Sequence, residues 1–329
     1  MVDEVLRSDG DAPPRALPDD PVGYGSTATP WCFEARYIPR NLVGHWTDVV
    51  ALTGGRTGVL LGCCPTEGRR TGIEALRSQS RAELMRTADP VRTLSGFANS
   101  PMSALCAVID GDTMTFSING HSSAALSSAG MAPVALSAGA GRPSVSPLAA
   151  GTTVLMSSGP IRSAGTLLGD CTGVHLDQLA DRVIQGLASD SGAAAVLYRH
   201  PPQPLSITMP ADPSSLAVSR GLLRDWLSAA GLGTEMAADV LLAAGEATAN
   251  STEHAVVSSP GPVEITLEGQ LRESALRLTI SDNGCWKPAD DSPGHRGHGL
   301  LLMRALVDSV DVTTGPDGTN VTMVKELSR

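Results

Sequence analysis

The sequence predicts an α+β protein built from two domains. The chain has 329 residues, 42% of them hydrophobic, which is enough for two separate cores. Short apolar runs typical of strands alternate with longer stretches of helical pattern along most of its length. Residues 199–213 interrupt this alternation with five prolines around a short apolar run. Because proline ends regular elements, we expect the first domain to end there and the second to begin.

Composition narrows the class of protein. A net charge of −10 argues against a general nucleic-acid-binding surface. No apolar run approaches the roughly 18 residues that span a bilayer, and the acidic N-terminus lacks the apolar core of a secretory signal. We therefore expect a cytoplasmic protein with no membrane and no direct nucleic-acid contact. The six cysteines include no Cys-x-x-Cys pair, so reduced thiols are expected.

The first domain is expected over residues 30–199. Residues 1–29 before it carry six acids and four prolines with almost nothing to bury, which predicts a disordered acidic tail. Two apolar runs around an Asp-Gly-Asp turn predict a hairpin over 104–119. Asp89-Pro90 either ends the helix predicted over 72–88 or starts the next one. Other strands are predicted at 47–52, 58–62, 124–127, 152–156 and 193–198, with a helix at 176–188.

The second domain is expected over residues 205–329, after a proline-rich linker and domain start at 200–213. Its most informative stretch is a helix predicted over 241–256, where Glu246, Asn250 and His254 recur every four residues and so share one face. Helices whose polar residues only face water can carry the same row. The other elements are predicted as helices at 214–230 and 299–307 and strands at 205–209, 263–268, 275–282, 310–314 and 319–326.

Glycine-containing motifs follow this helix along the chain. Asp282-Asn283-Gly284 ends a strand, where a carboxylate can accept an amine and the glycine leaves room for a flat ring. Residues 295–299 lead into a helix, whose free backbone N–H groups can close on a phosphate. Gly318-Thr319 stands at the start of a late strand. Taken singly, each motif also fits a plain turn, a helix cap or the start of a strand.

Together these stretches resemble the N, G1, G2 and G3 boxes of the GHKL ATP-binding superfamily. The resemblance rests on Glu246…Asn250…His254-Ala255, Asp282-x-Gly284, Arg296-Gly297-x-Gly299-Leu300 and Gly318-Thr319. The local sequences GEATANSTEHA and RGHGLLLMRALVD are similar to the bacterial anti-sigma-factor serine kinase branch of that superfamily. The resemblance covers residues 205–325, and it implies the superfamily's α/β sandwich (Bergerat) fold with ATP and Mg²⁺ as cofactors.

The resemblance implies a role for each matched residue. Asn250 would hold Mg²⁺ through its amide oxygen, and Glu246 would orient or deprotonate the serine hydroxyl that attacks the γ-phosphoryl group. Asp282 would receive the adenine amine, and His254 has no catalytic role. Gly297 and Gly299 would cradle the phosphates, and Thr319 would support the adenine end. The matched residues that complete the nucleotide site are Gly284, Arg296, Gly297, Gly299, Gly318 and Thr319.

The first domain resembles a PPM-type serine/threonine phosphatase, of the kind that reverses phosphorylation by anti-sigma-factor kinases. The resemblance rests on residues 35–39, 43–49, 61–63 and 118–121, which read ARYIP, VGHWTDV, LGC and INGH. It implies an αββα sandwich. Members of that family bind two Mn²⁺ or Mg²⁺ ions through aspartates, and these ions generate the attacking hydroxide.

Most of those aspartates are absent from this chain. The corresponding positions are His45, Asp48, Cys63, Ser158, Ser191 and Gly192. Because hard cations need several oxygen ligands, we expect no Mn²⁺ or Mg²⁺ here and a catalytically inactive, degenerate phosphatase domain. His45 with Cys63 and Cys64 is also a soft-metal or redox pattern, whereas the simpler interpretation is a lost site filled by small or neutral residues.

These resemblances imply a kinase that phosphorylates an anti-sigma-factor antagonist, a small STAS-type domain. A sigma factor is a second expected partner, and kinases of this branch are commonly homodimers. One alternative is a non-catalytic module that binds its partner in an ATP-dependent way; the intact Glu246 favours the kinase. Another is a PPM phosphatase with residual activity, which the lost aspartates disfavour.

Overall fold

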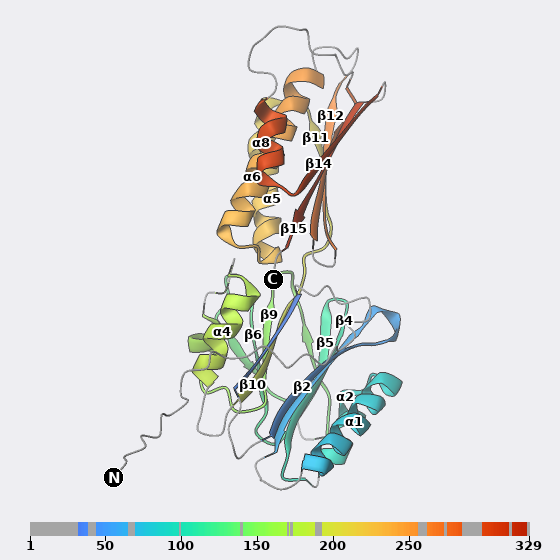
Figure 1. The fold of residues 1–329 in the computed structure, drawn as a ribbon, viewed down its shortest axis with the longest axis vertical. Coiled ribbons are helices and arrows are strands. Elements are labelled where there is room, and N and C mark those ends of the chain that lie inside the picture. Colours follow the sequence, from blue (N-terminus) through green and yellow to red (C-terminus); the bar gives the residue numbers. More distant parts are fainter. Residues whose placement is uncertain are drawn as a thin grey trace, which may run out of the picture.

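The computed structural model describes residues 32–38, 44–64, 70–98, 100–138, 141–169, 171, 174–187, 193–255, 262–272, 275–284, 298–315 and 318–327. They form two domains, stacked end to end along the long axis (Figure 1). The last strand of the first domain, β10 (Ala193–Arg199), leads through a short segment into the first strand of the second, β11 (Leu205–Pro210). Within the described residues, no helix is long and apolar enough to cross a membrane.

The first domain consists of two antiparallel sheets packed face to face between helices, so the predicted αββα sandwich is confirmed. The strand orders are β1-β10-β9-β6-β7 and β2-β3-β4-β5-β8. The predicted hairpin is β4–β5, with Asp110 opposite Thr113. The strands are β1 (Phe33–Ile38), β2 (Gly44–Ala51), β3 (Thr57–Cys64), β4 (Ser103–Asp110), β5 (Thr113–Asn119), β6 (Ser123–Ser127), β7 (Val134–Leu136), β8 (Ser144–Pro147), β9 (Thr153–Ser157) and β10.

Alternating side chains along each strand divide the interior of this domain into layers. On β3, Leu61 points into the core between the two sheets, while Leu60 points outward to the helices. The helices α1 (Arg70–Thr87) and α2 (Pro90–Leu94) cover that outer face. On the other side of the sandwich, α3 (Ala164–Leu168) and α4 (Leu176–Leu187) cover the sheet that contains β10.

The boundary between α1 and α2 settles the open question at Asp89-Pro90. Ala88 has a φ of 50°, which ends α1 because a helix cannot continue through the left-handed region. The Asp89 side chain then accepts hydrogen bonds from the N–H groups of Val91 and Arg92, and Pro90 occupies the first turn of α2. Asp89 therefore starts the second helix.

Some elements carry no clear signal in the sequence and were not predicted: β1, β7, β8 and α3. β7 and β8 are short and largely exposed, so their residues show no apolar alternation. In β1, charged residues hide the strand. Arg36 is buried in spite of its charge because it bonds Glu34 at 2.9 Å and Asp181 of α4 at 2.7 Å.

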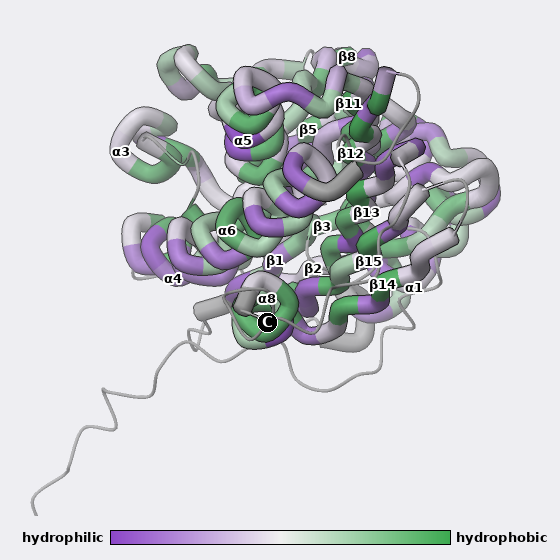
Figure 2. Tube along the Cα trace, turned by 90° about the horizontal axis from the view of Figure 1, so that it is seen from above, coloured by the Kyte–Doolittle hydropathy of each residue, from purple (hydrophilic) through white to green (hydrophobic). Residues whose placement is uncertain are grey.

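The second domain is a two-layer α/β sandwich, as predicted. Its sheet has the order β11-β12-β13-β15-β14, and helices cover one face around a single core. Figure 2 shows α5 and α6 side by side, each with hydrophobic and hydrophilic stretches in alternation. The further elements are α5 (Pro213–Ala230), α6 (Thr234–Asn250), β12 (Glu264–Arg272), β13 (Ala275–Asp282), α8 (His298–Leu306), β14 (Ser309–Gly315) and β15 (Gly318–Glu326).

The bounds predicted for the central helix were wrong at both ends. Helix α6 begins at Thr234, directly after Gly233, two turns before the predicted start at residue 241. It ends at Asn250, and residues 251–255 form a π-turn. A π-turn bonds each residue to the fifth one along, so the α-helical hydrogen-bond spacing ends at Asn250. The side chain of His254 lies outside the described residues.

Candidate nucleotide-binding site

The helix-side half of the candidate site forms where α6 meets the start of α8. A Cβ atom on Gly299 would lie 3.0 Å from Oε2 of Glu246 and 3.5 Å from Nδ2 of Asn250. Glu246 and Asn250 therefore crowd against the first turn of α8, where backbone N–H groups lack helical partners. A carboxylate and a carboxamide beside free N–H groups suit a divalent cation together with a phosphate. Arg296 and Gly297 lie outside the described residues, so their roles stay predictions.

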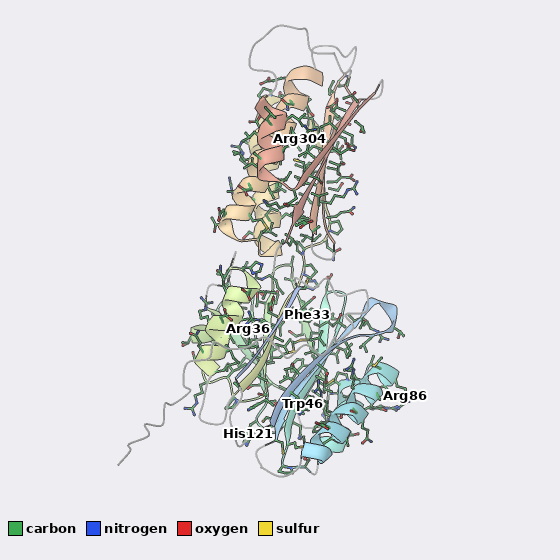
Figure 3. All side chains as sticks on the ribbon, viewed as in Figure 1. Phe33, Arg36, Trp46, Arg86, His121 and Arg304 are labelled. Carbon is green, nitrogen blue, oxygen red and sulfur yellow. The ribbon has the colours of Figure 1, made fainter. Side chains whose placement is uncertain are left out.

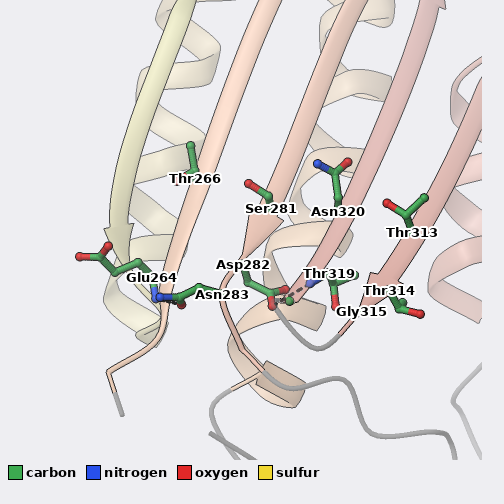
Figure 4. Close-up of a pocket in the computed structure, with 11 residues that line it drawn as sticks. Glu264, Thr266, Ser281, Asp282, Asn283, Thr313, Thr314, Gly315, Thr319 and Asn320 are labelled. Carbon is green, nitrogen blue, oxygen red and sulfur yellow. Dashed lines mark hydrogen bonds between the residues drawn. The ribbon is translucent and has the colours of Figure 1, made fainter.

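The strand-side half is centred on Asp282, the last residue of β13. Its Oδ1 accepts hydrogen bonds from the N–H groups of Gly284 at 3.1 Å and Thr319 at 3.3 Å. Thr319 lies opposite Asp282 in the β13–β15 pairing, as Figure 4 shows. The carboxylate is only 8% exposed. One buried oxygen therefore joins the turn after β13 to the start of β15, which fixes the carboxylate in one orientation.

Gly318 has a structural reason to be glycine. Its φ is 128°, a value that residues with a side chain rarely adopt, and a Cβ atom there would lie 1.7 Å from the Asp282 carbonyl oxygen. Its strand partner Gly315 has no atom within 4 Å of the corresponding point. Gly318 thus allows β15 to begin against the backbone of Asp282.

A groove of about 490 Å³ opens at the same end of the sheet. Figure 4 shows Thr266, Ser281, Asn320 and Thr313 in a row on the face turned away from the helices. Asp282 and Thr319 border this groove, but Glu246 and Asn250 do not line it. The groove is therefore a polar hollow on the open face of the sheet, separate from the helix-side half of the site.

In the first domain, the structure brings together three of the positions at which the resemblance predicts the metal ligands of the phosphatases. His45 and Cys63 lie opposite each other on β2 and β3. Nδ1 of His45 is 2.8 Å from Oγ of Ser158, and Sγ of Cys63 donates to the Ser158 carbonyl oxygen at 3.2 Å. The Ala194 N–H donates to the same Ser158 Oγ at 3.0 Å. We call His45, Cys63 and Ser158 the His45 cluster.

The His45 cluster is a network of hydrogen bonds between the two sheets. Burial raises the pKa of the Cys63 thiol above its ordinary value, while a hydrogen bond with Ser103 opposes the shift. Within the described residues, no group of at least three His, Cys, Asp or Glu side chains could hold a metal ion. Figure 3 places the nearby Trp46 and His121 at the end of the domain away from the second domain.

Asp48 does not belong to this cluster, which corrects its assignment beside the other metal positions. His45 and Asp48 are three residues apart on β2, so their side chains point to opposite faces of the sheet. The Asp48 side chain is 0% exposed and accepts two hydrogen bonds of 2.8 Å from Arg77 of α1. It anchors α1 to the sheet. Ser191 and Gly192 lie outside the described residues.

Sequence reasoning also missed a residue that holds the two site helices together. Nζ of Lys325, on β15, donates to the Leu306 carbonyl oxygen at the end of α8 at 2.7 Å and to Asp239 of α6 at 3.4 Å. A cation at the end of a helix is favourable because the free carbonyl groups there carry partial negative charge. The signal in the sequence is weak: a lysine that directly follows the apolar pair Met323–Val324.

Comparisons with known proteins agree with this geometry. Residues 209–325 match the family described as the histidine kinase-like ATPase domain. This match covers the second domain over almost its whole length. The matched residues include Glu246, Asn250, Asp282, Gly299 and Thr319, which the structure arranges around the start of α8 and the end of β13.

Individual relatives match the second domain or most of the chain. The serine-protein kinase RsbW of Listeria innocua is 29% identical over 139 residues, which cover 38% of this chain and 87% of that protein. Its counterpart from Listeria monocytogenes gives the same values. A crystal structure of the RsbU and RsbW domains of a Mycobacterium tuberculosis protein covers 90% of this chain and 93% of its own, at 21% identity and a TM-score of 0.45.

Proposed function

We propose that the protein is an ATP-dependent serine/threonine kinase that regulates a sigma factor. The observation that carries the proposal is the position of Glu246 and Asn250 against Gly299, at the first turn of α8 in the ATPase domain. Relatives of this domain include serine-protein kinases, which supports the same chemistry here. An intact carboxylate at position 246 is what such a reaction needs from the protein.

The residues present fit Mg²⁺ and ATP. Gly299 has no side chain, so the space beside Glu246 and Asn250 stays open. A Cβ atom at this position would lie only 3.0 Å from Oε2 of Glu246. Asn250 would hold the metal through its carboxamide oxygen, and Asp282 would accept the adenine amine. When bound, magnesium ATP supplies the phosphoryl group that is transferred. Glu246 would orient the hydroxyl group of the substrate and take its proton.

The proposed substrate is a serine or threonine on an anti-sigma-factor antagonist of the STAS type, with a sigma factor as a second partner. The first domain would serve as a docking or sensing module without phosphatase activity. The His45 cluster supports the absence of phosphatase activity, because His45 and Cys63 both bond Ser158 at positions where hard cations would need several oxygen ligands.

Phosphoryl transfer to a purified antagonist tests the proposal. The full-length protein is mixed with magnesium ATP and candidate STAS domains, and phosphate on the antagonist is followed by mass spectrometry. We expect transfer that Glu246→Ala abolishes and that Glu235→Ala, in the first turn of the same helix, leaves intact. ATP binding without transfer to any antagonist would instead support a non-catalytic, ATP-dependent binding module.

A further inference from the structure

The two domains meet at a buried arginine at the end of β10. Arg199 is only 2% exposed. Its guanidinium group bonds the first domain in several places: Nε donates to Oγ1 of Thr153 at 3.1 Å, Nη2 to the Cys171 carbonyl oxygen at 3.0 Å, and Nη1 to the Val174 carbonyl oxygen at 2.7 Å. These bonds hold the planar group in one orientation.

A further hydrogen bond of Arg199 crosses to the second domain. Nη1 also donates to the carbonyl oxygen of Gly231, at 3.5 Å. Gly231 is the C-terminal cap of α5, with a φ of 73°, and its N–H returns to the last turn of that helix. A Cβ atom on Gly231 would lie 1.9 Å from Nη1. The guanidinium group therefore needs a residue without a side chain at the end of α5.

The charge of Arg199 explains why this contact matters. Burial lowers the pKa of Arg199, which means that the interior disfavours its charged form. Among the described residues, Arg199 forms no ion pair with a carboxylate. The C-terminal end of α5 carries partial negative charge, so the second domain stabilises a cation that belongs to the first.

The backbones of the two domains approach each other closely beside this contact. Gly151 of the first domain has a φ of 77°, and a Cβ atom there would lie 3.1 Å from the carbonyl oxygen of Ala229 in the last turn of α5. A cavity of about 260 Å³ beside it is lined by Cys171 and Arg199 from one domain and by the end of α5 from the other. The connecting segment is held as well, because Nε1 of Trp226 donates to the Gln203 carbonyl oxygen at 2.8 Å.

We propose that Arg199 and Gly231 form an interdomain clamp that is thermodynamically coupled to nucleotide binding. The turn at Gly231 leads directly into α6, which carries Glu246 and Asn250 at its far end as one continuous helix. Holding the start of α6 limits where its far end can lie against Gly299. A site that is already ordered loses less conformational entropy on binding. The protein with a closed clamp therefore binds nucleotide more tightly. Linkage is reciprocal, so nucleotide also closes the clamp.

The proposal rests on nucleotide binding by the ATPase domain, and Cys171 provides a separate readout. Its thiol is 6% exposed and borders the interdomain cavity, next to a carbonyl that Arg199 bonds. In the full-length protein, we expect saturating magnesium ATP to slow alkylation of Cys171 by about fivefold or more, the scale of typical allosteric coupling. Mass spectrometry of the Cys171 peptide separates this thiol from the others.

Arg199→Lys tests the clamp itself, because lysine keeps the charge but cannot bond several carbonyl groups in one plane. We expect this variant to lose the effect of ATP on Cys171 and to bind ATP about fivefold more weakly. The matched control is Arg182→Lys, since Arg182 bonds the Leu168 carbonyl oxygen at 3.0 Å wholly within the first domain. It should leave both measurements unchanged.

Gly231→Asn is the second variant, in case Arg199→Lys fails to fold. Asparagine tolerates the left-handed backbone, but its Cβ atom would displace the guanidinium group. We therefore expect Gly231→Asn to lose the effect of ATP on Cys171 and to bind ATP more weakly, as for Arg199→Lys.

The clamp is refuted if the wild-type protein binds ATP and Cys171 alkylation does not respond, or if a folded variant keeps full ATP affinity. A wild-type protein that binds no ATP refutes both proposals. ATP binding without phosphoryl transfer refutes the kinase alone, and the alkylation result then decides the clamp.

Discussion

Asp282 uses one carboxylate oxygen to hold two backbone N–H groups, at 3.1 Å and 3.3 Å. An asparagine side chain at this position would keep an acceptor oxygen for both, but it would present an NH₂ group where the proposed adenine amine needs an acceptor. We therefore expect Asp282→Asn to leave the fold intact and to weaken ATP binding about tenfold or more, measured by calorimetry. Asp311→Asn, at an exposed position on β14, is the control. Unchanged ATP affinity in Asp282→Asn would refute the assignment of this site.

Gly318 and Gly315 are strand partners with different surroundings. Gly318→Ala would bring a Cβ atom to 1.7 Å from the Asp282 carbonyl oxygen at a φ of 128°, whereas the same change at Gly315 meets open space. We expect the first variant to lose about 3 kcal/mol of unfolding free energy in urea and the second about 0.5 kcal/mol or less. Equal losses in both variants would contradict the close approach of the two strands.

A soft-metal or redox role for the His45 cluster would depend on the thiol of Cys63. Burial raises its pKa, so the reactive thiolate is scarcer in the folded protein than in an unfolded chain at the same pH. We expect slow alkylation of Cys63 at neutral pH and a rate that is still rising above the ordinary pKa of a thiol, as measured by peptide mass spectrometry. Rapid reaction at neutral pH would indicate a thiolate and favour the metal or redox interpretation.

At the scale of elements, α1 is attached to the first domain by a buried ion pair. Asp48, whose side chain is 0% exposed, accepts two bonds from Arg77, whose side chain is 37% exposed. We expect Asp48→Asn to cost about 2 kcal/mol of unfolding free energy, below the usual loss for a broken buried pair because Arg77 can turn toward water. Glu83→Gln, which breaks the exposed pair with Arg86, should cost about 0.5 kcal/mol or less. Similar losses would mean that Asp48 does not anchor α1.

At the scale of the whole molecule, ligand binding should stabilise more than the domain that holds the ligand. Saturation at about one hundred times the dissociation constant adds about 2.7 kcal/mol to the unfolding free energy of the ATPase domain. If the clamp couples the domains, magnesium ATP should also raise the unfolding temperature of the first domain in calorimetry, and Arg199→Lys should remove that second shift. If ATP leaves the unfolding temperature of the first domain unchanged in the wild-type protein, the two domains unfold independently of each other.

The sequence alone determined the fold class of both domains and pointed to the residues of the proposed nucleotide site. Apolar alternation and turn glycines predicted the elements, while the two sandwich folds and the roles of the site residues followed from the resemblance of short motifs to the GHKL and PPM families. Local patterns also set the limits of this approach. The sequence placed the start of α6 too late, although Met236, Ala237 and Val240 of its first two turns pack into the core of the domain. It also extended the α-helix to residue 256, although the α-helix ends at Asn250 and a π-turn follows.

Only the tertiary structure decided which distant groups meet. The alternation of a strand already implies that His45 and Asp48 face opposite ways, but it takes α1 and Arg77 to show what Asp48 does there. Likewise, no pattern links Arg199 to Gly231. Their contact depends on how a strand end in one domain and a helix end in the other are brought together, and burial then makes a bare helix end the favourable place for a positive charge.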